Sequence, residues 1–128
     1  MEYLIGVVLS LAVGGMVITV GFDRERAYYP ILLIVVASYY VLFAAMGASG
    51  RIVMVESLVA GGFLLVAVIG FKSNLWLVAG ALVGHGVFDF VHARFIANPG
   101  VPSWWPGFCM AFDVIAGGLL ASRLIRAK

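Results

Sequence analysis

The sequence predicts an all-α integral membrane protein, a bundle of about five transmembrane helices. Of the 128 residues, 64% are hydrophobic and only 11% are charged, whereas a soluble domain carries about 25% charged residues. This composition excludes a disordered chain, a nucleic-acid-binding surface and an ordinary soluble enzyme. Five apolar stretches also reach the roughly 20 residues that a membrane-spanning helix needs, and none shows the alternation of a barrel strand.

The predicted spans form a single domain over residues 1–128 and cover about 3–22, 30–47, 52–71, 74–96 and 105–125. The first is expected to be a permanent span and not a cleaved signal peptide, because Glu2 stands where a basic segment would be and the apolar run is too long. Ser73 or Asn74 is a suitable N-cap for the fourth span. The Pro- and Gly-containing segment 98–103 cannot continue that helix.

Basic residues predict the orientation of the bundle. Five spans place six of them on the side of the C-terminus and two on the other: Arg24, Arg26, Lys72, Arg123, Arg126 and Lys128 against Arg51 and Arg94. The positive-inside rule then places the N-terminus outside and the C-terminus in the cytoplasm. We therefore expect a multi-pass protein of the cell's inner (plasma) membrane.

Five ionisable residues fall inside the predicted spans, where such residues are costly and usually mark a functional site or a buried pair. They are Glu56, His85, Asp89, His92 and Asp113. The three on the fourth span follow an i, i+4, i+7 spacing, which puts them on one face of the helix. That face must point into the bundle or into a water-filled cavity.

Depth brings the other two acids to the same level. Asp113 lies about eight residues into the fifth span, roughly 12 Å deep, and Glu56 lies about five residues beyond Arg51, roughly 7 Å deep. Because the third and fifth spans run inward from the outer side, both acids reach the level of the fourth span's polar face. The sequence thus predicts an intramembrane His/Asp site in the outer half of the bundle.

The residue types of this site suit three kinds of chemistry. Imidazole and carboxylate groups bind transition metals, zinc above all, which makes His85, Asp89, His92 and Asp113 the candidate ligands. Since His85 and His92 are two turns apart, roughly 10 Å, two of the three residues on the fourth span plus Asp113 or Glu56 make a better set. As a metal-free site, Asp89, Asp113 and Glu56 are the candidate catalytic acids and bases.

The third interpretation is structural, with His–carboxylate pairs that fix the packing of the helices. Glu56 is ambiguous in this respect, because Arg51 or Arg94 near the interface could pair with it. Cys109 is interpreted as a small packing residue, although it shares a helix face with Asp113. Of Tyr39 and Tyr40, in the middle of the second span, at least one should turn inward and find a hydrogen-bond partner.

Segments 84–92 and 98–114 read GHGxxDxxH and NPGVPxWxPxFCxxxDV. This pattern resembles the signature of a family of small bacterial membrane proteins of unknown function. The resemblance covers about a third of the chain and implies a bacterial multi-helix membrane protein without assigning a reaction. Membrane hydrolases with Asp and His zinc ligands, such as the alkaline ceramidase–receptor superfamily, are similar in residue types only, because they have about seven spans and another motif order.

Three functions are open from the sequence. The first is a metal-dependent enzyme that acts on a lipid or another apolar small molecule. The second is a small transporter or proton-coupled component, and the third is a structural or accessory subunit. A homo-oligomer in the lipid bilayer is expected in each case, because five helices bury little interior and the small residues Gly80 and Gly84 favour close helix contacts. No nucleic-acid partner is expected.

Overall fold

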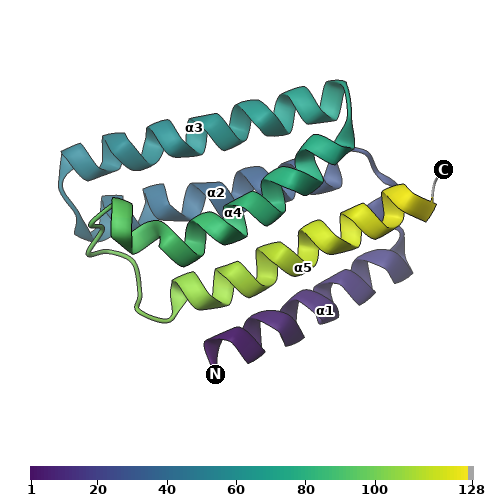
Figure 1. Ribbon diagram of the computed structural model, residues 1–128, viewed down its shortest axis with the longest axis horizontal. Helices are drawn as coiled ribbons and strands as arrows, with labels where there is room; N and C mark the ends of the chain where they lie inside the picture. Colours follow the sequence, from purple (N-terminus) through teal and green to yellow (C-terminus); the bar gives the residue numbers. More distant parts are fainter. Residues whose placement is uncertain (127–128) are drawn as a thin grey trace.

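The computed structural model describes residues 1–126 and consists of helices (Figure 1). In chain order they are α1 (Glu2–Val20), the 3-10 turn η1 (Phe22–Arg24), α2 (Tyr28–Gly47), α3 (Gly50–Lys72), α4 (Leu75–Phe95) and α5 (Trp105–Arg126). All five α-helices are long and apolar enough to cross a membrane, as is typical of a multi-pass membrane protein. The five predicted spans are therefore confirmed as helices, with ends that shift by one or two residues.

Local chemistry explains where the helices begin and end. Gly21, at a φ of 98°, takes the left-handed conformation that closes α1, which glycine adopts at little cost. Pro30 lies in the first turn of α2, where a helix needs no backbone N–H donor. Asn74 is the N-cap of α4, and its Oδ1 accepts a hydrogen bond of 3.0 Å from the backbone N–H of Trp76.

Successive helices run in opposite directions, so that α1 and α5 end on the side opposite to the N-terminus (Figure 1). Helix α4 lies at the centre and packs against α2, α3 and α5. Helix α1 packs along α5, and of the other elements only η1 comes close to its backbone within the described residues. The first and last helices of the chain are thus neighbours, and the α4–α5 contact is the most extensive in the bundle.

Glycine allows α4 and α5 to approach closely. A Cβ on Gly86 would lie 3.1 Å from the carbonyl oxygen of Met110, and one on Gly117 would lie 3.0 Å from that of Ala79. The small-residue pair that the sequence suggested for this role, Gly80 and Gly84, faces open space instead. The close contact therefore forms beside the ionisable residues of α4.

Two arginines tie one end of the bundle together. Arg123 Nε lies 4.0 Å from Asp23 Oδ2, which joins η1 to the end of α5. Arg26 Nε donates a hydrogen bond of 2.6 Å to the carbonyl oxygen of Phe71, which joins the first connection to the end of α3. Arg26 and Arg123, two of the basic residues counted for the orientation, thus lie at the same end of the molecule.

Candidate functional site

All five ionisable residues predicted to lie inside the bundle are buried there, each with 2% or less of its surface exposed. Helix α4 carries three of them, on the single face that the i, i+4, i+7 spacing predicted. The other two come from α3 and α5. The structure separates these five side chains into two groups that lie one above the other along α4.

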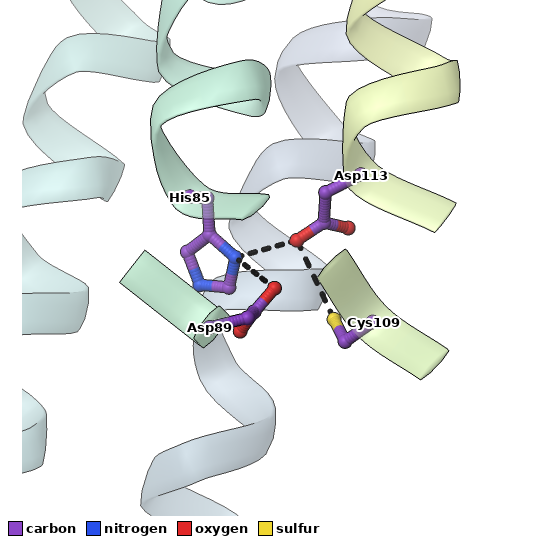
Figure 2. Close-up of side chains that lie close together, drawn as sticks. All are labelled: His85, Asp89, Cys109 and Asp113. Atoms are coloured by element: carbon purple, nitrogen blue, oxygen red, sulfur yellow. Dashed lines mark hydrogen bonds and ion pairs between the residues drawn. The ribbon is translucent and has the colours of Figure 1, made fainter. Parts of the chain in front are cut away.

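The first group, the His85 cluster, consists of His85, Asp89, Cys109 and Asp113 (Figure 2). His85 Nδ1 lies 2.6 Å from Asp113 Oδ2 and 3.4 Å from Asp89 Oδ2. The Cys109 thiol donates to Asp113 Oδ2 at 3.4 Å. One ligand atom from each of the four residues lies within 4.8 Å of all the others, so the four side chains point at one common position between α4 and α5.

Helical spacing on both elements produces this convergence. His85 and Asp89 are four residues apart on α4, and Cys109 and Asp113 are four residues apart on α5, so each pair occupies one face of its helix. Gly86, next to His85, lies against the backbone of α5. The missing side chain lets the two faces meet at hydrogen-bonding distance.

The His85 cluster holds more acid than base. Two carboxyl groups face one imidazole, so the cluster contains one acid more than its single base can pair with. Tyr40 satisfies one oxygen, because its hydroxyl donates to Asp89 Oδ1 at 2.6 Å. Asp89 Oδ2 and Asp113 Oδ1 are buried without any hydrogen-bond partner. Buried charge of this kind is expensive unless a cation or a proton balances it.

The second group, the His92–Glu56 pair, has one acid for one base, and Glu56 Oε1 is also buried without a hydrogen-bond partner. His92 Nε2 lies 2.7 Å from Glu56 Oε2, and the Asn98 amide donates to the same oxygen at 2.8 Å. One acid thus meets one base and one neutral donor. The alternative partners of Glu56, Arg51 and Arg94, are both exposed, and Glu56 bonds to His92 and Asn98 instead.

Tyr40 connects the two groups. Its hydroxyl reaches Asp89, while its ring stacks on His92 with centroids 3.9 Å apart and an angle of 9° between the planes. Its carbonyl oxygen accepts a second hydrogen bond from the Asn98 amide, at 3.1 Å. Only 1% of Tyr40 is exposed, which confirms that one of the two mid-span tyrosines turns inward.

Sequence reasoning undervalued two residues of the site. Asn98 was interpreted as part of a helix break, because it precedes Pro99 and Gly100, yet its side chain joins α2, α3 and the connection to α5. Cys109 was interpreted as packing, yet it belongs to the His85 cluster. The four-residue spacing from Asp113 was the available signal for Cys109, and Asn98 offered none.

The His85 cluster could hold a metal ion. Zinc binds imidazole nitrogen, thiolate sulfur and carboxylate oxygen at about 2.0–2.3 Å, so ligand atoms around one tetrahedral ion lie roughly 3.4–3.8 Å apart. The four candidate atoms, within 4.8 Å of one another, need to move by only about 1 Å. The hydrogen bond from Tyr40 to Asp89 is the kind of outer contact that orients a ligating carboxylate.

Comparisons with known proteins find no match: no family model, no curated protein and no solved structure matches this chain. The resemblance carried by segments 84–92 and 98–114 therefore stays a prediction. What the protein does has to be inferred from the geometry and chemistry of its two buried groups.

Proposed function

We propose that this chain is a membrane-embedded metalloprotein whose His85 cluster binds one divalent transition metal ion and acts on a lipid or another apolar small molecule. The surplus of buried acid supports the proposal above all. Two carboxylates share one imidazole, and Asp89 Oδ2 and Asp113 Oδ1 lack any hydrogen-bond partner. A divalent cation among these oxygens removes the imbalance.

The donor set favours zinc over the hard cations. Calcium and magnesium prefer oxygen ligands alone, whereas imidazole and thiol groups beside carboxylates suit zinc and its transition-metal neighbours. His92, which the sequence included among the ligands, and Glu56, which it included among the catalytic acids, bond to each other. In the proposal this pair is structural, and Asp89 and Asp113 are the acids of the site.

The roles of the four residues follow from what each one faces. In the proposal His85, Asp89 and Asp113 hold the ion, with His85 Nδ1 at 2.6 Å from Asp113 Oδ2 and 3.4 Å from Asp89 Oδ2. Cys109 is the fourth residue of the cluster, and it also lines an apolar cavity between α1, α2 and α5. Catalytic zinc sites use three protein ligands and leave one position open, and such an ion polarises a bound group or activates a water molecule. We place that open position beside Cys109.

A metal-free proton-binding site, as in a proton-coupled transport component, is the second candidate. Its support is again the two aspartates with unpartnered oxygens, Asp89 and Asp113, since a proton bound by Asp113 would also balance the charge. Tyr40, between the two groups, could pass a proton to or from Asp89. Metal content separates the two candidates.

The test is elemental analysis of protein purified without chelators or acid steps. We expect close to one transition metal ion per chain, and its loss in Asp113→Asn. The matched control is Asp23→Asn, which changes a buried acid outside the cluster and should keep the metal. Cys109→Ala should also keep it, because three ligands remain, whereas a closed four-ligand site would lose it.

Wild-type protein without metal would refute the metal centre. In that case a large loss of thermal stability in Asp113→Asn would point to structural pairing, because removal of one partner leaves the other uncompensated. Unchanged or raised stability would instead favour the proton-binding site, since the substitution removes a surplus charge.

A further inference from the structure

An apolar cavity of about 560 Å³ lies between α1, α2 and α5. Val13 of α1, Val35 of α2 and Phe108 of α5 are among the residues that line it. Cys109 forms part of its wall and is also a member of the His85 cluster. Cys109 is thus the one residue that the cavity wall shares with the His85 cluster.

The geometry of the helices opens this cavity toward the bilayer. The backbones of helices α1 and α2 do not approach each other closely within the described residues, and α1 lies along the outer side of α5 (Figure 1). Side chains on both cavity walls are partly exposed, among them Leu9 of α1 and Val35 of α2, each at 42%. A molecule dissolved in the lipid can therefore enter sideways, without passing through water.

We propose that this cavity binds one acyl chain of a membrane glycerolipid and brings it to Cys109. This inference rests on the proposed function, since it names the class of molecule that meets the metal centre. The walls offer a guest almost nothing but hydrocarbon and aromatic rings. The acyl chains of bilayer lipids have the same apolar chemistry and surround a membrane protein at very high local concentration.

The volume fits an acyl chain. A methylene group takes close to the ~30 Å³ of a liquid water molecule, so about 560 Å³ holds roughly 18 methylene groups.

Among the described residues that line the cavity, only Trp105 has a buried polar side-chain atom without a hydrogen-bond partner. It begins α5, lines the cavity and is 9% exposed, and its indole Nε1 is buried without a hydrogen-bond partner. A buried indole N–H normally has an acceptor. An ester carbonyl of a bound glycerolipid would accept that hydrogen bond, while its chain runs along α5 past Cys109, one turn further into the bundle.

The experiment uses bromine-labelled phospholipids, which quench tryptophan fluorescence on contact. Trp76→Phe and Trp104→Phe together leave Trp105 as the reporter. Val13→Phe fills the cavity from α1, and Val35→Phe fills it from α2 in case the first variant does not fold. Val8→Phe is the matched control, because Val8 lies on α1, is 57% exposed and lines none of the described cavities.

We expect lipids brominated along the acyl chain to quench Trp105 strongly in the reporter protein and in Val8→Phe. A cavity-filling variant should relieve most of that quenching and keep its metal. Three results would overturn the inference: no quenching of Trp105, equal quenching in a cavity-filling variant, or relief by a few mole per cent of an isoprenoid alcohol, which would make that compound the occupant.

Metal analysis on the same samples separates this inference from the proposed function. Protein with bound metal but without the quenching pattern keeps the metal centre and rejects the acyl-chain site. Protein without metal rejects the proposed function, whatever the fluorescence shows.

Discussion

Replacing His92 by Phe tests the division of the buried groups into a balanced pair and an acid-rich cluster. The Phe ring keeps the stacking against Tyr40, where the centroids are now 3.9 Å apart, so little packing is lost. Glu56, 1% exposed, loses the partner 2.7 Å away and retains only the Asn98 amide as a donor. An uncompensated carboxylate is left inside the bundle.

Breaking a buried ion pair from one side costs about 3–5 kcal/mol of unfolding free energy. For a chain of this size that corresponds to a fall of roughly 10–20 °C in Tm. The measurement is thermal unfolding of the detergent-solubilised protein, together with metal content. We expect the large fall in Tm with the metal retained, because His92 is outside the group of residues that converge on the metal position.

A second variant isolates the charge effect. Glu56→Gln combined with His92→Phe removes the carboxylate charge and keeps an oxygen for the Asn98 amide, so it should be more stable than His92→Phe alone. The interaction free energy from the full double-mutant cycle should be about 1–3 kcal/mol. A wild-type Tm in His92→Phe, or loss of its metal, would refute the division into two groups.

The remaining predictions concern single contacts, topology and assembly. Tyr40→Phe removes the hydrogen bond to Asp89 and should weaken metal affinity about 10–100-fold, measured by competition with a chelating dye; unchanged affinity would contradict a role for Tyr40 in orienting the ligand. Gly100→Ala places a Cβ against the carbonyl oxygen of Phe43 and should cost more than the ~1–3 kcal/mol of ordinary overpacking, because backbone cannot move aside; a wild-type melting curve would count against this contact. Reporter fusions at Gly100 and after the last residue should place the former outside and the latter in the cytoplasm, and the reverse result would refute the predicted orientation. Detergent-corrected light scattering should give the molar mass of an oligomer, and the mass of a monomer would contradict the predicted homo-oligomer.

Most of the fold was predictable because the bilayer imposes a length on every span. The five apolar runs and the polar breaks between them sufficed, and Asn74 was a recognisable cap. The order of packing was not predictable. In a membrane the lipid-facing surface of a helix is as apolar as its buried surface. No pattern in α1 therefore indicates that it packs along α5 and not along α2, its neighbour in the sequence.

The ionisable residues of the candidate site were predictable, whereas Cys109, Asn98 and the division into two groups were less so. Depth and helical spacing brought His85, Asp89 and Asp113 to one level, and the structure brings them together. The same reasoning could not decide between Asp113 and Glu56 as partners of the residues on α4. That choice depends on how α3 and α5 are rotated about their own axes, which spacing along one helix does not determine.

The distant pairing of α1 with α5 has a consequence for biosynthesis. The Ser10 hydroxyl donates to the carbonyl oxygen of Phe112, and 102 positions separate the two residues. At about 5–20 residues per second on the ribosome, α1 is synthesised roughly 5–20 s before its partner. The face of α1 that later meets α5 therefore lacks its final contact during that interval, and the first helix of the chain can complete its packing only when the last one has been made.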